Sequence, residues 1–259
     1  MIKIEGLTVS YGKKKPPVLH EITCTVPAKK ITVIAGPNGS GKSTLLKSIS
    51  GFLKAKSGRI FLDGKNLCEY SSQDRARKLA FLPQSRRIPE LTVRQLVLRG
   101  RFPYTAFPRS YSRHDYDVVE TCLSTLNMTA LGDCMLSEIS GGQQQKAWLA
   151  MALAQETDIL VLDEPLTFLD VRQQLELLQV LKNLSSQGKT ILLIVHDLHT
   201  ALTFADNMIV LSGGSLAAEG QPGLIAENGI IDRVFGIHTE KITAPGGRPV
   251  YTFTGGDLL

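Results

Sequence analysis

The segment Gly36–Thr44, with the sequence GPNGSGKST, constrains the fold of this chain more than any other feature. It matches the phosphate-binding pattern G-x-x-x-x-G-K-[ST]. The apolar, β-branched run 31–35 before it predicts a buried parallel strand, and residues 43–50 after it predict a helix that ends at Gly51. A strand, a glycine-rich turn and a helix in this order predict a site for a nucleoside triphosphate at the start of the helix.

Each residue type in this segment has a physical reason to meet a phosphate. Glycines let backbone N–H groups turn inward because no Cβ stands in the way, and the helix N-terminus adds a partial positive charge. We expect Lys42 to reach the β- and γ-phosphates and the Ser43 hydroxyl to coordinate Mg²⁺. A glycine-rich turn without a ligand is the alternative, and the Lys-Ser pair after the last glycine argues against it. The expected nucleotide contacts are Gly36, Pro37, Asn38, Gly39, Ser40, Gly41, Lys42, Ser43 and Thr44.

Two adjacent carboxylates, Asp163 and Glu164, follow an apolar strand predicted at 159–162. Ligands of open α/β sheets bind at the carboxyl ends of the strands. We expect Asp163 to lie on the magnesium side, acting mostly through water, and Glu164 to act as the general base that polarises the attacking water. Taken alone, the pair could equally be solvated acids before Pro165, but a phosphate-binding loop in the same chain disfavours that alternative.

The segment Ser140–Gln143, with the sequence SGGQ, is typical of a helix start, because serine at the N-cap and glutamine three residues later form a capping box. Apolar residues follow at helical spacing, at Ala147, Trp148, Met151 and Ala154, so one face of this helix is expected to pack on a neighbour. A capped, glycine-rich helix start is also an anion site. An ordinary helix cap is the alternative.

Together these three segments resemble the ATP-binding subunits of ABC transporters, and the resemblance extends over nearly the whole chain. It implies an α/β fold with a P-loop NTPase core and a mainly parallel sheet, an antiparallel β lobe and an inserted helical subdomain. Ile139, Gln144 and Lys146 stand where leucine and two arginines are usual, and we interpret them as tolerated variants. The resemblance also implies that four residues contact the γ-phosphate of an ATP held by a second subunit, namely Ser140, Gly141, Gly142 and Gln143.

Four single residues complete the resemblance. Gln84, after an apolar strand, matches the glutamine that reaches both Mg²⁺ and the attacking water, and His196 matches the switch histidine that hydrogen-bonds the γ-phosphate. Tyr11 matches the aromatic residue that stacks on adenine, and Asp170 closes the segment after the Asp-Glu pair. Taken singly, Gln84 could be a surface glutamine, His196 a core histidine and Tyr11 an exposed loop aromatic. The implied catalytic residues are Lys42, Gln84, Glu164 and His196, the metal ligands are Ser43, Gln84 and Asp163, and Tyr11 and Asp170 are further nucleotide contacts.

Composition agrees with a soluble, cytosolic subunit. At 259 residues, the chain can hold one large domain with an inserted lobe. The longest apolar runs are strand-sized and the start lacks a signal peptide, so no membrane-spanning segment is expected. A net charge of +5 raises the question of nucleic acid, but apart from Lys13–Lys15 and Arg86–Arg87 the basic residues are scattered, and no nucleic-acid partner is expected. Reduced thiols are expected at Cys24, Cys68, Cys122 and Cys134.

The order of the elements predicts how the chain is organised. Short strands with turn signals at Ser57-Gly58 and Asp63-Gly64 indicate an antiparallel lobe from residues 1–30 and 55–82, and residues 88–155 are helical in pattern. Strands at 159–162, 190–195 and 207–211 then alternate with helices at 171–185 and from Leu198, which indicates a mainly parallel sheet with helices on both faces. We expect one ABC ATPase domain over 1–259, with a core at 1–87 and 156–235, a helical subdomain at 88–155 and a C-terminal extension at 236–259.

The resemblance implies an ATPase that powers an importer from the cytoplasmic face of the cell membrane. Two subunits face each other head to tail with ATP and Mg²⁺ between the P-loop of one and the SGGQ segment of the other, and hydrolysis drives separate permease subunits supplied by a substrate-binding protein. Residues 91–103, the pair Ala147-Trp148 and the tail 233–250 resemble the iron-siderophore, haem and cobalamin importers, with the ferrichrome-like branch nearest.

A short permease helix is expected in a groove beside Gln84. Its wall would be formed by part of the apolar residues of Arg86–Tyr104 and by Arg86, Arg87, Arg94, Arg99 and Arg101. One alternative to a transport function is an ABC ATPase of DNA repair or translation, which usually has a coiled-coil insertion or two cassettes. Another is a module that binds ATP without hydrolysing it, and intact Lys42, Glu164 and His196 argue against it.

Overall fold

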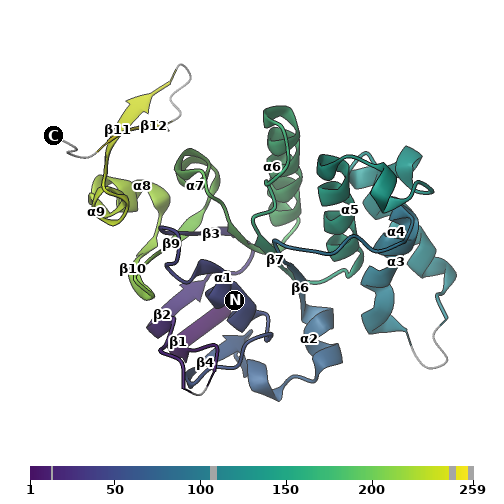
Figure 1. Ribbon diagram of the computed structural model, residues 1–259, viewed down its shortest axis with the longest axis horizontal. Helices are drawn as coiled ribbons and strands as arrows, with labels where there is room; N and C mark the ends of the chain where they lie inside the picture. Colours follow the sequence, from purple (N-terminus) through teal and green to yellow (C-terminus); the bar gives the residue numbers. More distant parts are fainter. Residues whose placement is uncertain (13, 106–109, 245–248, 256–259) are drawn as a thin grey trace. The chain divides into compact units, whose positions relative to one another are not determined.

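The computed structural model describes residues 1–12, 14–105, 110–244 and 249–255 (Figure 1). The chain divides into two compact units, one formed by Met1–Glu69 with Thr190–Leu259 and the other by Tyr70–Lys189. Lys13 of the basic run and tail residues 245–248 lie outside the described residues. The first unit holds the phosphate-binding loop and His196, and the second holds Gln84, the SGGQ segment and the Asp-Glu pair.

An antiparallel sheet forms one part of the first unit, as predicted. Its strand order is β2-β1-β4-β5, with β1 at Ile2–Val9, β2 at Leu19–Val26, β4 at Ser57–Leu62 and β5 at Lys65–Asn66. The predicted turn at Asp63-Gly64 joins β4 to β5, and both residues have positive φ. The turn predicted at Ser57-Gly58 is wrong: Gly58 lies inside β4, where a Cβ would stand 2.4 Å from the carbonyl oxygen of Gly6.

Parallel strands form the other part of the first unit. Strand β3 (Ile31–Ala35) lies between β8 (Thr190–Ile194) and β9 (Asn207–Ser212), parallel to both, and β10 (Ser215–Gly220) is antiparallel to β9. Every residue of β3 and β8 is buried, as continuous apolar runs predict. Helices α1 (Lys42–Ile49) and α7 (Leu198–Phe204) follow β3 and β8, close to their predicted positions.

The C-terminal part of the first unit was expected only as an extension. It contains α8 (Pro222–Glu227), α9 (Ile230–Phe235) and a hairpin of β11 (Ile237–Thr243) and β12 (Pro249–Gly255). The hairpin strands pair in continuous antiparallel register from Ile237 with Gly255 to Thr243 with Pro249. In Figure 1 this hairpin lies at the C-terminal end of the chain, next to α9.

In the second unit, residues 70–82 correct the expected extent of the antiparallel lobe. Helix α2 (Ser72–Lys78) begins at the Ser71 cap, whose hydroxyl accepts a hydrogen bond from the backbone N–H of Asp74. Strand β6 (Leu79–Leu82) pairs in parallel with β7 (Ile159–Asp163), so it belongs to the parallel architecture. The sequence predicted only short strands here. The capping Ser71 and the apolar run of β6 were treated as one segment, so helix α2 between them was not expected.

Helices fill the rest of the second unit. They are α3 (Val93–Leu98), the 3₁₀ helix η2 (Arg99–Tyr104), α4 (Arg113–Thr125), the short 3₁₀ turns η3 (Thr129–Leu131) and η4 (Leu136–Glu138), α5 (Gly141–Ala154) and α6 (Val171–Ser186). In the first unit a further 3₁₀ turn, η1 (Leu67–Glu69), follows β5. Helix α3 packs against α4 and α5 with Val93, Leu96 and Val97 almost fully buried.

Arg101 corrects one prediction for this region, because it cannot form the wall of an open groove. It is only 2% exposed and donates hydrogen bonds to Asp115 (2.8 Å), to Glu156 (2.7 Å) and to the carbonyl of Ala154 (2.7 Å). The side chain therefore ties η2 to α4 and to the end of α5.

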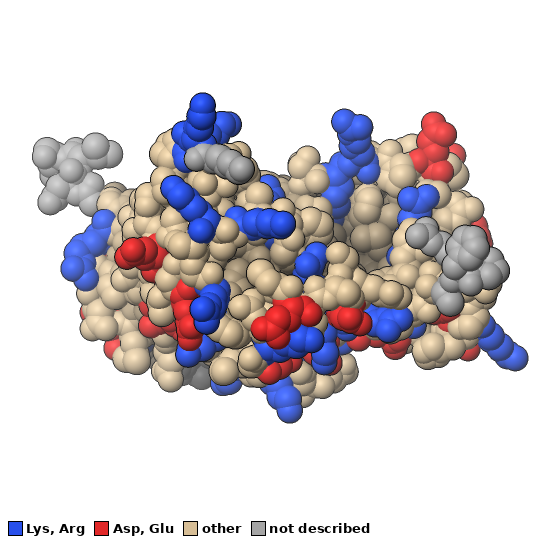
Figure 2. Space-filling view, turned by 90° about the horizontal axis from the view of Figure 1, so that it is seen from below, with Lys and Arg blue, Asp and Glu red and all other residues tan. Residues whose placement is uncertain are grey.

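The charge distribution and the helix lengths add two general features. On the face shown in Figure 2, Lys and Arg side chains lie singly or in small groups, with Asp and Glu side chains among them. Within the described ranges, no helix has both the length and the apolar character needed to cross a membrane. The four cysteines are free thiols, and burial raises the pKa of Cys24 and Cys122 to about 12.

Candidate functional site

The phosphate-binding loop of the first unit has a backbone that only glycine can adopt at two positions. Gly36 has φ +152°, and a Cβ there would stand 2.3 Å from the carbonyl oxygen of Leu211 and 2.6 Å from Oγ of Ser40. Gly41 has φ +98°, and a Cβ there would stand 2.5 Å from a methyl carbon of Leu19. These close approaches form the cradle that the glycine pattern predicts.

Helix α1 begins without a side-chain cap, because Gly41 is its N-cap residue. Backbone N–H groups of the first turn are then available to an anion. The hydroxyl of Ser40 is buried and has no hydrogen-bond partner among the residues that the structure describes. Nζ of Lys42 folds back over the loop and donates to the carbonyls of Gly36 (2.7 Å) and Pro37 (2.9 Å). An orphaned buried hydroxyl and a lysine held over a glycine cradle fit a triphosphate.

Tyr11 and His196 are the other predicted site residues of this unit. The Tyr11 hydroxyl lies 3.1 Å from Oγ1 of Thr44 in the loop, and its side chain is half exposed, as a stacking platform requires. His196 is exposed and directly precedes Asp197, the N-cap of α7. Burial alone would raise the pKa of Asp197, but hydrogen bonds from Thr200 and His199 hold it below its ordinary value. The adenine and γ-phosphate contacts of Tyr11 and His196 stay predictions.

The second unit brings Gln84 and Glu164 together. Glu164 follows β7 with φ +54° and is only 9% exposed, while Asp163 is 2% exposed. Nε2 of Gln84 donates to Oε2 of Glu164 at 2.5 Å, and the Thr167 hydroxyl donates to the same oxygen at 3.5 Å. Two residues 80 positions apart in the chain therefore share one hydrogen bond at the end of a buried strand.

The SGGQ segment forms the predicted capping box. The Ser140 hydroxyl accepts from the backbone N–H of Gln143 (3.3 Å), and the Gln143 side chain accepts from the backbone N–H of Ser140 (2.9 Å). The amide of Gln144 donates to the carbonyls of Leu136 and Ile139, and Lys146 forms an ion pair with Glu176. The side chains of Gln144 and Lys146, two of the three departures from the family pattern, thus have local partners. Whether the segment contacts a nucleotide stays a prediction.

Asp170 has a structural role that the sequence did not reveal. Its carboxylate accepts from the backbone N–H of Gln173 at 2.8 Å, so it caps helix α6. Gln173 also lies against the SGGQ segment, because a Cβ on Gly142 would stand 2.6 Å from its Oε1. The nucleotide contact expected of Asp170 stays a prediction beside this cap.

A hollow lies beside Gln84, where the sequence predicted a groove. It has a volume of about 440 Å³ and is lined by residues near Gln84, by one face of α5 and by Thr167 and Phe168. In it Arg86 lies over the Trp148 ring at 5.3 Å and donates to Gln145, and burial lowers the pKa of Arg86 to about 10. Phe168 is 78% exposed with φ +68°. A bulky residue at positive φ gives no signal in the sequence.

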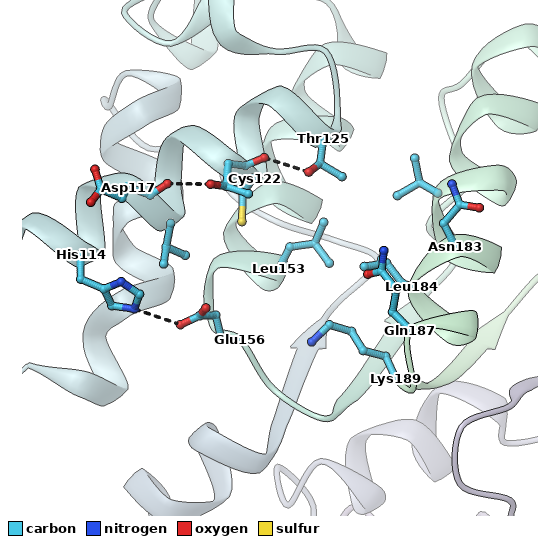
Figure 3. Close-up of a pocket in the computed structure, with 13 residues that line it drawn as sticks. His114, Asp117, Cys122, Thr125, Leu153, Glu156, Asn183, Leu184, Gln187 and Lys189 are labelled. Carbon is cyan, nitrogen blue, oxygen red and sulfur yellow. Dashed lines mark hydrogen bonds and ion pairs between the residues drawn. The ribbon is translucent and has the colours of Figure 1, made fainter.

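A larger cavity, of about 770 Å³, lies elsewhere in the second unit (Figure 3). Figure 3 shows Asp117, Cys122 and Thr125 along α4 on one side, Asn183 of α6 and Gln187 directly after α6 on the other, and Leu153 between them. None of the described residues in its lining belongs to the predicted site. Cavity size therefore does not identify the functional site in this protein.

The fold and the site together define the class of protein to which this chain belongs. A glycine cradle with a buried lysine at the start of a helix, and an acidic pair on a buried strand with a hydrogen-bonded glutamine, define a P-loop nucleotide-binding protein of the α/β type. The sequence model of the family described as "ABC transporter" matches residues 19–167. The chain belongs to the ABC transporter family, as its ATP-binding ATPase component.

Relatives match almost the full chain. The ferric enterobactin transport ATP-binding protein FepC of Escherichia coli (strain K12) is 38% identical, covering 95% of this chain and 91% of its own. The iron(3+)-hydroxamate import ATP-binding protein FhuC of Bacillus subtilis (strain 168) is 38% identical, covering 94% and 91%. The hemin import ATP-binding protein HmuV of Rhodococcus jostii (strain RHA1) is 32% identical, covering 94% and 82%.

Solved structures of ABC transporters have the same fold as this chain. A structure described as a metal-chelate type ABC transporter in an inward-facing conformation has a TM-score of 0.82 at 26% identity, covering 98% of this chain and 96% of its own. A dimeric bacterial ABC transporter cassette has a TM-score of 0.77 at 28% identity, covering 86% and 99%. The predicted ABC ATPase fold is confirmed.

Proposed function

We propose that this chain is the ATP-hydrolysing subunit of an importer that takes up an iron(III)-siderophore through separate permease subunits. The observation that carries the hydrolytic part is the hydrogen bond between Gln84 and Glu164 at the end of β7. It holds a carboxylate at the strand end where a general base would act, in a chain that also has an intact phosphate cradle.

The oxygen donors expected to bind Mg²⁺ have the right chemistry. Ser43 offers a hydroxyl, Asp163 a carboxylate, and Gln84 an amide oxygen that its bond to Glu164 does not use. Magnesium prefers such oxygen ligands and keeps several waters. Bound Mg²⁺ would neutralise phosphate charge, while Lys42 binds the phosphates, Glu164 accepts a proton from water, and His196 donates to the γ-phosphate.

The active form is a homodimer in which each nucleotide contacts both protomers. The P-loop of one protomer binds ATP, and Ser140, Gly142 and the α5 N-terminus of the other protomer meet its γ-phosphate. The uncharged, glycine-rich start of α5 suits an anion. The dimer docks on the permease subunits at the cytoplasmic face of the membrane, and a substrate-binding protein delivers the cargo to the permease.

The names of the relatives support an iron–chelate complex as the cargo. FepC and FhuC are named for ferric enterobactin and iron(3+)-hydroxamate, both iron–chelate complexes. HmuV, named for hemin, is less similar at 32% identity, so haem or cobalamin import is the second candidate. A non-transport ABC ATPase is disfavoured because FepC, FhuC and HmuV are all named for transport or import.

A gene deletion tests the cargo directly. The deletant should grow poorly with a hydroxamate siderophore as sole iron source and recover with the wild-type gene, but not with a Lys42→Ala variant. Normal siderophore uptake together with lost haem or cobalamin uptake would reassign the cargo and leave the ATPase function in place.

A further inference from the structure

Helix α7 begins directly behind His196 and is too short to hold its own position. It spans seven residues, Leu198–Phe204. The Asp197 carboxylate caps it by accepting from the backbone N–H groups of His199 (3.2 Å) and Thr200 (2.7 Å) and from the Thr200 hydroxyl (2.6 Å). Isolated helices of this length are unstable in water, so the position of α7 depends on its neighbours.

In the first unit, α7 packs against strand β3, helix α8 and strand β12 of the C-terminal hairpin. Ala201, Leu202 and Phe204 of α7 are buried. The contact with β12 includes a polar link: Nδ1 of His199 lies 3.2 Å from the carbonyl oxygen of Tyr251. Because a carbonyl only accepts, the His199 tautomer in this bond carries its proton on Nδ1.

Tyr251 is an anchor and not part of a loose tail. Its side chain is only 4% exposed, and a Cβ on Gly223 in α8 would stand 3.4 Å from its hydroxyl oxygen. Lys241 of β11 forms a second link to α8 through its ion pair with Glu227 at 2.8 Å. The hairpin is therefore linked to α8 through the Tyr251 side chain and the Lys241–Glu227 ion pair, and to α7 through the backbone carbonyl of Tyr251.

We propose that His199 and Tyr251 are positioning residues for His196. Their hydrogen bond holds the first turn of α7 against the C-terminal hairpin, and so sets the direction in which His196, three residues before His199, presents its imidazole. The catalytic consequence rests on the proposed ATPase function. The mechanical part does not, because it concerns only the order of α7.

Substitutions of His199 separate the hydrogen bond from general packing. Asparagine places its amide N–H at the same number of bonds from the backbone as Nδ1 of histidine, whereas glutamine places it one bond further out. His199→Ala and His199→Gln should lower kcat roughly fivefold, the effect of losing one ordinary hydrogen bond, and leave the KM for ATP nearly unchanged. His199→Asn should keep kcat close to the wild-type value.

Two matched controls use the same part of the chain. His238→Ala changes a histidine of β11 whose side chain is 63% exposed and should leave kcat unchanged. Tyr251→Phe keeps both the ring and the carbonyl and should behave as wild type, whereas Tyr251→Ala removes the anchoring ring and should reproduce the loss seen with His199→Ala.

Hydrogen exchange gives a readout that does not need ATPase activity. The amides of residues 200–204 should exchange faster in full-length His199→Ala and Tyr251→Ala than in wild type, and at the wild-type rate in His199→Asn. Equal kcat losses in His199→Asn and His199→Ala, or unchanged exchange and kcat in both His199→Ala and Tyr251→Ala, would overturn the proposal. A wild-type protein without ATPase activity would instead refute the proposed function, and the exchange rates would still decide whether the hairpin holds α7.

Discussion

Glu164 combines burial, a left-handed backbone and a hydrogen bond from Gln84, three features that a solvated surface acid would not need. A non-glycine residue at positive φ is strained, and such strain is concentrated at functional sites. The same loop places Thr167 on the carboxylate of Glu164 and leaves Phe168 exposed. At the residue scale, therefore, the loop after β7 fixes one carboxylate.

Replacing that carboxylate by an amide tests its role as the base. Glu164→Gln keeps size and hydrogen bonding but cannot accept a proton, so steady-state ATP hydrolysis should fall at least ~10²-fold while ATP binding survives. The variant should also accumulate as an ATP-bound dimer on gel filtration. Glu90→Gln, at an exposed position of the same unit, is the control and should hydrolyse ATP at the wild-type rate. Near-normal turnover by Glu164→Gln would remove Glu164 from the mechanism.

Residues were predictable where their chemistry is local. The glycine cradle, the Ser140–Gln143 capping box and the Asp-Glu pair each depend on neighbours within a few positions. Gln84 and Glu164 are 80 positions apart and His199 and Tyr251 are 52 apart, so no local pattern encodes these two hydrogen bonds. The resemblance placed Gln84 and Glu164 near the same nucleotide but did not predict that they bond to each other.

At the scale of the elements, the turn between β3 and α1 was predictable because glycines, lysine and helix period all point to the same structure. Residues 70–82 and the C-terminal hairpin were not, since a two-turn helix and an exposed strand pair have weak periodic signals. The Ser57-Gly58 pair shows the same limit, because a glycine in a strand and a glycine in a turn look alike in sequence.

The geometry of the β3–α1 turn predicts that alanine at Gly36 weakens ATP binding, whereas alanine at Gly220 does not. Gly36→Ala would place a methyl group against the Leu211 carbonyl and should weaken ATP binding about fivefold or more, through strain on the order of 1–3 kcal/mol. Gly220→Ala is the control, because Gly220 has a similar φ of +145° and open space around its Cβ position. Equal ATP affinities of the two variants, measured by calorimetry, would contradict the cradle.

The buried carboxylate of Asp115 in helix α4 should make the stability of the fold depend on pH. Burial alone would raise the pKa of Asp115, but hydrogen bonds from Arg101 and Ser112 hold it below its ordinary value of 3.8. A lowered folded pKa contributes stability that is fully present above about pH 4 and is lost as the pH falls through that pKa. Asp115→Asn removes one of the two carboxylates that pair with Arg101 and leaves Glu156 as the other, so it should cost about 2 kcal/mol of unfolding free energy at pH 7.

Urea unfolding at several pH values measures the contribution of Asp115 to the free energy of unfolding. The difference between wild type and Asp115→Asn should shrink below about pH 3 as the wild-type carboxylate is protonated. Asp117→Asn, two positions along the same helix but exposed, should differ from wild type by less than about 0.5 kcal/mol. A pH-independent cost for Asp115→Asn would mean that packing, and not the ion pair, stabilises this helix.

At the scale of the whole molecule, the proposed function requires this chain to bind permease subunits. The structure narrows the proposed permease-docking surface, because Arg101 is buried and Arg86 lies over Trp148. Arg87 is exposed on the same loop and remains available. Arg87→Glu should weaken co-purification with the permease about tenfold or more and leave the basal ATPase rate unchanged, while the exposed Arg233→Glu should affect neither. Full permease association by Arg87→Glu would place the docking surface elsewhere.

We propose that two copies of this chain build each ATP site together, and mixing two inactive variants is the sharpest test of that shared site. Lys42→Ala lacks the phosphate-binding lysine, and Gly142→Asp places a charged side chain in the SGGQ segment, where even a Cβ meets Gln173. Each variant alone should be inactive, with Gly142→Asp keeping monomer ATP affinity. The mixture should recover hydrolysis, because each heterodimer has one intact P-loop facing one intact SGGQ segment, and the rate should rise with protein concentration. Full activity of Gly142→Asp alone, or no recovery on mixing two folded variants, would contradict the shared site.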